Sequence, residues 1–309
     1  MKLIIQPDAG LSPVIAAIKQ AKKTIDVLIF RLDLQDVTRS LEAAAARGVF
    51  VRALIAHTNR GGEKSLRKLE MRLLEKGITV TRTADDLVRY HGKMLIVDRR
   101  VLHVYGFNFT GLDIGKSRSF GATTKNARIV QEAVKLFEAD CARQPYGSSC
   151  DRLIVSPDNS RERLAAFIKG ARKQLLIYDP KIGDQGVLRL LHERAKAGVD
   201  VRVIGKVGGK SPALVSERYP GRRLHVRAMI RDGRRAFLGS QSLRRLELDS
   251  RREIGVIVTD PAVVAQMHKV FEEDWSRTDS GQRDAKAAAE AAHGAKSGPA
   301  AAEDSSTAA

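Results

Sequence analysis

The feature that most constrains the fold of this chain is an internal repeat. A segment that begins at Tyr90, YHGKMLIVDRRVLHVYGFN, has a counterpart at Leu224, LHVRAMIRDGRRAFLGSQS. Other segments match in the same order: LIIQPDAG with LIVSPDNS, AAARGVFVRALI with RAKAGVDVRVIG, and VKLFEADCARQ with HKVFEEDWSRT. A long internal repeat indicates two copies of one folding unit. We therefore expect two halves, at residues 1–147 and 151–276, joined by the turn-rich segment PYGSSCD.

Short apolar runs alternate with amphipathic segments in each half. In the first half this pattern predicts strands at 3–6, 25–30, 49–55, 78–82, 93–97 and 101–105, and helices at 13–22, 36–47, 64–75 and 126–141, with Ser12 as a candidate N-cap. The alternation predicts an α/β fold, with a mixed β-sheet flanked by helices in each half. Residues 278–309 contain few large apolar side chains, and we expect an Ala-rich tail that is disordered or a fraying helix.

The repeated segment places reactive side chains at one spacing, H-x-K-x-x-x-x-D, in both halves. The two copies hold His91, Lys93 and Asp98, and then His225, Arg227 and Asp232. Side chains two residues apart on a strand share a face, so each histidine lies beside a cation. A neutral imidazole can attack a phosphate whose charge the cation neutralises. Further hydrogen-bond donors to the phosphate oxygens are expected from Asn108, Ser240 and Ser242.

This doubled motif resembles the signature of the phospholipase D superfamily, H-x-K-x4-D-x6-G-S-x-N in each half. The resemblance covers about residues 1–276. It implies that the halves are related by a pseudo-twofold axis and that the two histidines meet in one site. It also implies a phosphodiesterase or phosphatidyltransferase that acts on phospholipid through a phosphohistidine, with no metal and no other cofactor.

The chain departs from that signature at several positions. The first half has Tyr105-Gly106 where the family has Gly-Ser, and the second half has Arg227 for Lys and Ser242 for Asn. Glu253 lies 28 residues after His225, where the family has an acid that orients the opposite histidine, and the matching position in the first half is Ser119. The resemblance therefore implies that Glu253 orients His91 as the nucleophile. It leaves His225, the acid for the leaving group, without a carboxylate partner.

Other interpretations of these residues stay open. Asp98 and Asp232 also suit hairpin turns, because Asp starts turns well, and Glu253 also suits an ordinary edge strand. The segment GKVGGKSP at 205–212 is not a phosphate-binding P-loop, because it lacks the first glycine of that motif. We interpret it and its counterpart RGGEKS at 60–65 as basic loops at the rim of the site.

The net charge of +18 predicts anionic partners. They include a phospholipid or other phosphodiester substrate and an anionic membrane surface. Nucleic acid fits the same charge, so a metal-independent nuclease of the superfamily and a catalytically degenerate phosphate-binding protein remain alternatives. The N-terminal segment MKLIIQPDAG does not resemble a signal peptide, and no apolar run is long enough to span a bilayer, so we expect a cytoplasmic protein that is at most peripheral to a membrane. We also expect a monomer in which Cys141 and Cys150 are reduced.

Overall fold

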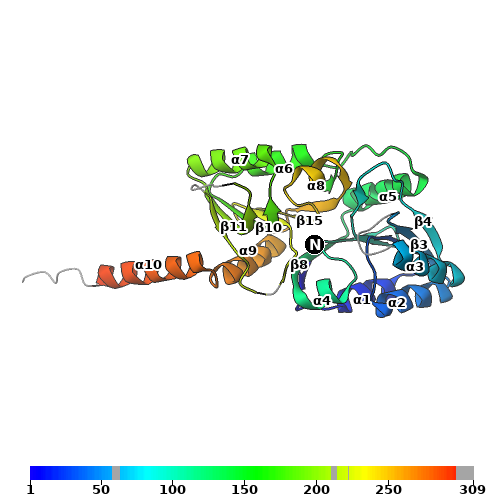
Figure 1. Cartoon of the computed structure of the whole chain (residues 1–309). Helices are drawn as coiled ribbons and strands as arrows, with labels where there is room; N and C mark the ends of the chain where they lie inside the picture. Colours follow the sequence, from blue (N-terminus) through cyan, green and yellow to red (C-terminus); the bar gives the residue numbers. More distant parts are fainter. Residues whose placement is uncertain (58–62, 210–213, 222, 297–309) are drawn as a thin grey trace, which may run out of the picture.

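The computed structural model describes residues 1–57, 63–209, 214–221 and 223–296, which form two α/β halves side by side (Figure 1). The elements of the first half are β1 (Lys2–Gln6), α1 (Ser12–Gln20), β2 (Thr24–Ile29), α2 (Gln35–Ala46), β3 (Phe50–Ile55), α3 (Glu63–Glu75), β4 (Thr79–Arg82), β5 (Arg89–Tyr90), β6 (Met94–Val97), β7 (Val101–Tyr105), α4 (Gly111–Lys116), β8 (Ser117–Thr124) and α5 (Ala127–Ala142).

The second half repeats this order, and its described residues contain no counterpart of α3. Its elements are β9 (Leu153–Val155), α6 (Ser160–Lys169), β10 (Gln174–Ile182), α7 (Gln185–Lys196), β11 (Asp200–Val207), β12 (Val215–Glu217), β13 (Arg223–Leu224), β14 (Ala228–Arg231), β15 (Arg235–Gly239), α8 (Arg245–Asp249), β16 (Arg251–Arg252), β17 (Ile254–Val258) and α9 (Pro261–Trp275), followed by α10 (Asp279–Lys296).

The two main sheets share one strand order, as the internal repeat predicts. The first runs β1-β8-β7-β6-β2-β3-β4, and the second, read from its other edge, runs β9-β17-β15-β14-β10-β11-β12. Both sheets are mixed, because β2 pairs with β3 in parallel and with β6 antiparallel, and β10 pairs with β11 and β14 in the same way. The predicted α/β architecture of two homologous halves is confirmed.

A single apolar cluster joins the halves. It contains side chains of both sheets together with side chains of α5 and α9, such as Leu136 and Phe271. Separate clusters lie beneath α1 and α2 in the first half and beneath α6 and α7 in the second. The halves therefore share one buried core rather than touching only at their surfaces.

Each half also lends a short strand to the other. β5 pairs in parallel with β16 of the second half, and β13 pairs in parallel with β8 of the first. The residues that follow these strands are anchored in the same way, since His91 N donates to Arg252 O (2.7 Å) and His225 N donates to Arg118 O (3.0 Å). This reciprocal exchange is the contact pattern that a pseudo-twofold relation predicts, and it brings both motif histidines to the junction of the halves.

The structure differs from the sequence predictions at several places. Ser12 is the first residue of α1 rather than its N-cap, because Leu11 precedes the helix without a side-chain cap. Helix α4 and strand β8 were not predicted. The tail, expected to be disordered or a fraying helix, is helical over Asp279–Lys296, where Ala, a good helix former, prevails.

Helix α10 extends away from the two halves (Figure 1), and residues 297–309 lie outside the described part of the chain. Its first turns are held by Trp275 Nε1, which donates to Asp284 (3.2 Å). Within the described residues, none of the helices combines the length and apolar character that crossing a bilayer requires.

Candidate active site

His91 lies between β5 and β6 and faces a carboxylate of the other half. Its Nδ1 is 2.8 Å from Oε2 of Glu253, which is fully buried between β16 and β17. An ionised carboxylate at this distance holds the imidazole proton on Nδ1 and leaves a lone pair on Nε2. The structure thus brings together the predicted histidine and the predicted orienting acid.

Lys93 lies against the same imidazole. Its Nζ is 3.0 Å from Nδ1 and 2.9 Å from Nε2 of His91, and the side chain is 1% exposed. Burial lowers the pKa of Lys93 to about 7, although Glu253 acts in the opposite direction. A bound phosphodiester anion would raise the pKa again, because it stabilises the ammonium form.

His225 also has a carboxylate neighbour, which corrects the expectation that it would have none. Oδ2 of Asp113 in α4 lies 3.6 Å from His225 Nδ1. The same carboxylate accepts from Asn108 N (2.8 Å) and Asn108 Nδ2 (2.7 Å), and Arg223 donates to its other oxygen. Burial alone would raise the pKa of Asp113, but His225, the Asn108 amide and Arg223 outweigh it and hold the pKa at about 2. The carboxylate is therefore ionised at neutral pH.

The sequence contained a signal for Asp113, but a spacing of 28 residues after the histidine does not lead to it. An acid follows five residues after Asn108 in the first half and five residues after Ser242 in the second, where it is Glu247. Asp113 also has the spacing of a capping box. Thr110 is the N-cap of α4, and its hydroxyl accepts from the N–H of Asp113 three residues later (3.2 Å). In the second half Glu247 is instead held by Arg244 and Arg251.

The equivalent positions have therefore diverged. Ser119, the counterpart of Glu253, is fully buried, and its hydroxyl makes no hydrogen bond within the described residues. The acid near His225 comes from α4, and the acid near His91 comes from the loop after β16. Each histidine therefore faces a carboxylate of the other half, and the two carboxylates stand at positions that the repeat does not match.

The motif cation of each half lowers the pKa of the histidine in the other half. Burial is the largest cause that lowers the pKa of both His91 and His225. Arg227 lowers the pKa of His91 further, and Lys93 does the same for His225. Arg227 itself donates from Nη1 to His225 O (3.0 Å). Both imidazoles are thus neutral at pH 7, and the arrival of an anionic phosphodiester favours the protonated form of one of them.

The predicted substrate-binding residues are placed at the site but have internal partners. Ser240 Oγ accepts from Ile254 N (3.1 Å), and Ser242 Oγ donates to Asp179. Asn108 is bound to Asp113, as described above. These contacts hold the loops after β7 and β15 in place. The structure therefore supports a role in shaping the site for these three residues more directly than a role as substrate donors.

Asp98 and Asp232 lie at the opposite ends of the motif strands from Lys93 and Arg227. Both occupy hairpin turns with positive φ, at 52° and 53°. The Asp98 carboxylate accepts from the backbone N–H groups of residues 22–24 at 2.7–3.1 Å, and Asp232 accepts from those of residues 172–174 at 2.7–3.2 Å. The structure therefore favours the turn interpretation over a catalytic one for both residues.

We expect Asp98→Ala to destabilise the fold without disabling the site. Three backbone donors at the start of β2 lose their acceptor, which we expect to cost about 1–3 kcal/mol of unfolding free energy. Denaturant unfolding measures this loss. The turnover number of the folded fraction should stay within about twofold of the wild type, because a carboxylate at this end of β6 touches no reacting atom. A loss of turnover by orders of magnitude in a fully folded Asp98→Ala protein would restore the catalytic interpretation.

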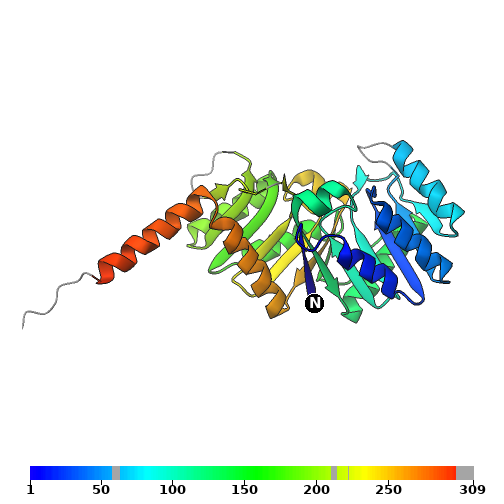
Figure 2. The same ribbon diagram turned by 90° about the horizontal axis from the view of Figure 1, so that it is seen from below.

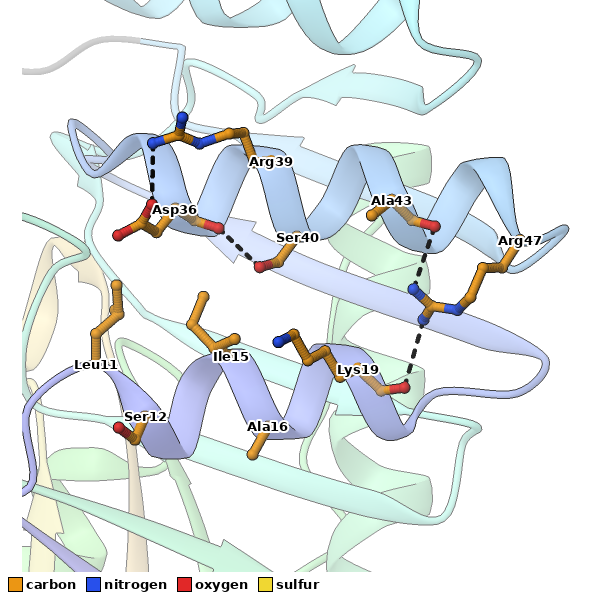
Figure 3. Close-up of a pocket in the computed structure, with 10 residues that line it drawn as sticks. All are labelled: Leu11, Ser12, Ile15, Ala16, Lys19, Asp36, Arg39, Ser40, Ala43 and Arg47. Atoms are coloured by element: carbon orange, nitrogen blue, oxygen red, sulfur yellow. Dashed lines mark hydrogen bonds and ion pairs between the residues drawn. The ribbon is translucent and has the colours of Figure 1, made fainter.

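A surface groove between α1 and α2 is separate from this site (Figure 3). Leu11, Ile15, Ala16 and Ala43 form its apolar part, and Lys19, Arg39 and Arg47 lie along it. Arg39 pairs with Asp36, and Arg47 donates to the carbonyl oxygens of Ala43 and Lys19. None of its lining residues belongs to the histidine site, so we assign it no part in the chemistry.

The two halves exchange strands, and each presents one histidine that faces a carboxylate of the other half. A family model described as "Cardiolipin synthase, PLD-like domain" matches residues 14–141 and 164–275. The chain therefore belongs to this family of phospholipase D-like proteins.

Two cardiolipin synthases of Bacillus species are distant relatives of this chain. Minor cardiolipin synthase ClsB of Bacillus subtilis is 24% identical over 62% of this chain and 57% of its own length. Cardiolipin synthase 1 of Bacillus cereus is 22% identical over 90% of this chain and 66% of its own length. The chain thus spans roughly three fifths of these relatives.

Solved structures share the fold. Phosphatidylserine synthase of Haemophilus influenzae superimposes with a TM-score of 0.66 at 13% identity, over 87% of this chain and 84% of that one. Polyphosphate kinase of Porphyromonas gingivalis superimposes with a TM-score of 0.73 at 21% identity, over 88% of this chain and 49% of that one. At such identities the likeness establishes the architecture.

Proposed function

We propose that this chain is a phosphatidyltransferase that moves the phosphatidyl group of a phospholipid to an alcohol, or to water, through a phosphohistidine at His91. The observation that carries the proposal is the pair of buried carboxylates, one behind each histidine: Glu253 at 2.8 Å from His91 and Asp113 at 3.6 Å from His225. The names of the matched cardiolipin synthases and of the phosphatidylserine synthase point to phospholipid as the substrate class.

In the first step Nε2 of His91 attacks the phosphorus of the donor lipid. A bond forms between nitrogen and phosphorus, and the bond from phosphorus to the leaving alcohol oxygen breaks. Glu253 keeps the Nδ1 proton in place and stabilises the imidazolium that develops. The protonated His225 gives its proton to the leaving oxygen, and the Asp113 carboxylate favours that protonated form.

In the second step the roles reverse. His225, now neutral, removes the proton of the incoming hydroxyl, whose oxygen attacks the phosphorus. The nitrogen–phosphorus bond breaks and His91 regains its neutral form. Lys93, next to His91, and Arg227, next to His225, neutralise the charge of the non-bridging oxygens in both steps. Arg227 can serve here in place of the usual lysine, because a guanidinium binds phosphate oxygens in a bidentate manner.

A product assay tests the proposal. Vesicles that contain phosphatidylglycerol are incubated with the protein, a short primary alcohol and EDTA. We expect a phosphatidyl-alcohol product that is absent with a His91→Ala variant. Failure of the wild type to form either this product or phosphatidic acid would contradict the proposal.

The second candidate function is a metal-independent nuclease, which the net charge of +18 favours. Single-stranded and duplex DNA are therefore incubated in parallel. Cleavage that persists in EDTA and disappears with His91→Ala, without any lipid product, would transfer the same mechanism to a nucleic-acid substrate. Salt-sensitive binding without any product would favour the degenerate phosphate-binding protein.

A further inference from the structure

Two exposed leucines occupy equivalent positions in the two halves. Leu112 of α4 is 50% exposed, and Leu246 of α8 is 39% exposed. Each leucine directly precedes a buried acid, Asp113 in the first half and Glu247 in the second. Single exposed apolar side chains are common on protein surfaces. Exposed leucines at equivalent positions beside one site indicate that both contact the same partner.

Both leucines lie on the face of the molecule that carries the site. Helix α4 leads directly into β8, and α8 leads directly into β16. These two strands anchor the histidines, because Arg118 O accepts from His225 N and Arg252 O accepts from His91 N. Figure 2 shows α4 and α8 toward the upper edge of the molecule and the N-terminus toward the lower edge, while Figure 1 shows α8 above and α4 below the sheets, so the two helices flank the junction of the halves. A flat surface can therefore meet both helices at once.

A third apolar side chain belongs to this face. Val88 is 59% exposed and lies three residues before His91. Its N–H donates to Ser250 O (3.0 Å), and Ser250 N donates to Leu246 O (3.1 Å), so Val88 sits at the end of α8. We call Val88, Leu112 and Leu246 the apolar rim.

Cations accompany the apolar rim. The Arg245 side chain, next to Leu246, is 89% exposed, and Lys116 is an exposed residue in the last turn of α4. Arg223, which pairs with Asp113, is 42% exposed. Aliphatic side chains that enter the headgroup layer, with cations that meet lipid phosphates, are the combination that holds a protein on an anionic bilayer. Nucleic acid would favour aromatic stacking platforms over aliphatic side chains.

We propose that the apolar rim inserts into the headgroup layer of an anionic phospholipid bilayer and thereby seats the two histidines over lipid phosphodiesters. The proposal rests on the proposed function in naming a phospholipid substrate. The docking itself can be measured without catalysis. The two histidines are only 8% and 6% exposed, so a substrate held in a bilayer has to be presented close to this face.

The test compares two double variants in co-sedimentation with vesicles, either of phosphatidylglycerol mixed with phosphatidylcholine or of phosphatidylcholine alone. The rim variant is Leu112→Ser/Leu246→Ser. The matched control is Met71→Ser/Leu74→Ser, which removes two side chains of α3 that are 58% and 46% exposed. We expect the wild type to bind anionic vesicles preferentially and the rim variant to bind them at least about tenfold more weakly, with the control within about twofold of the wild type.

Equal binding by the rim variant and the wild type would overturn the proposal, as would a wild type that ignores anionic vesicles. Turnover of a soluble p-nitrophenyl phosphodiester checks that the rim variant keeps its fold and site. If that turnover is lost, the single variants Leu112→Ser and Leu246→Ser replace the double one, and each must show a partial loss of binding.

The outcomes also separate this proposal from the proposed function. Vesicle binding through the rim without any phosphatidyl product would leave the docking surface in place and contradict the lipid activity. Lipid turnover that the rim variant performs as fast as the wild type would establish the activity and contradict the docking surface.

Discussion

A His91→Asn variant is expected to lose turnover of a phosphodiester by a factor of about 10⁴ or more, because no other group can form the covalent intermediate. The substitution keeps a polar N–H donor next to Glu253 in a smaller side chain, so the fold should persist. The measurement uses a soluble diester with a p-nitrophenolate leaving group. With His91→Asn we expect neither steady turnover nor an initial burst of p-nitrophenol.

His225→Asn serves as the matched comparison. The p-nitrophenolate ion leaves without a proton, so His91 can still be phosphorylated when the acid is missing. The variant should release close to one equivalent of p-nitrophenol per site and then stall, because no base activates the water for the second step. A burst with His91→Asn and none with His225→Asn would reverse the assignment of the two histidines.

Asp113→Asn is expected to slow the reaction by about 10- to 100-fold, even though Asp113 touches no substrate atom. Its carboxylate raises the pKa of His225 against the effects of burial and Arg227. Removing the charge lowers the pKa of His225, so the protonated form that serves as acid is lost at a lower pH. The loss in kcat should therefore be smaller under acidic conditions than under alkaline ones.

The pH profile separates this positioning role from a structural one. The alkaline limb of log kcat, measured with phospholipid, should move to lower pH in Asp113→Asn. Ser119→Ala is the control, because Ser119 is the position at which the repeat leads one to expect the acid. We expect its profile and rate to stay within about twofold of the wild type. A uniform loss in Asp113→Asn at every pH, with an unmoved limb, would contradict the role of Asp113 in orienting and charging His225.

Most of the fold was predictable because the repeat supplied a second observation for most of the predicted strands and helices. The hairpin strand Val101–Tyr105 has the predicted bounds, and most other elements shift by one or two residues. Helix α4 escaped prediction because it is short and contains two glycines, Gly111 and Gly115, which weaken the helical pattern. That omission mattered, because α4 carries Asp113.

The site was predictable where the repeat was exact and unpredictable where the halves had diverged. His91, Lys93, His225 and Arg227 follow one spacing in both copies. The carboxylates do not, since Glu253 and Asp113 come from positions that the repeat does not equate. The resemblance implied that Glu253 faces His91, but only the structure shows that Asp113 faces His225.

Mapping the covalent intermediate tests the central claim most directly. The His225→Asn variant is mixed with the p-nitrophenyl diester, quenched at alkaline pH to preserve phosphohistidine, digested and analysed by mass spectrometry. The account predicts a phosphoryl adduct on His91. An unmodified His91 in a protein that has released its burst of p-nitrophenol, with the adduct on another residue, would contradict it.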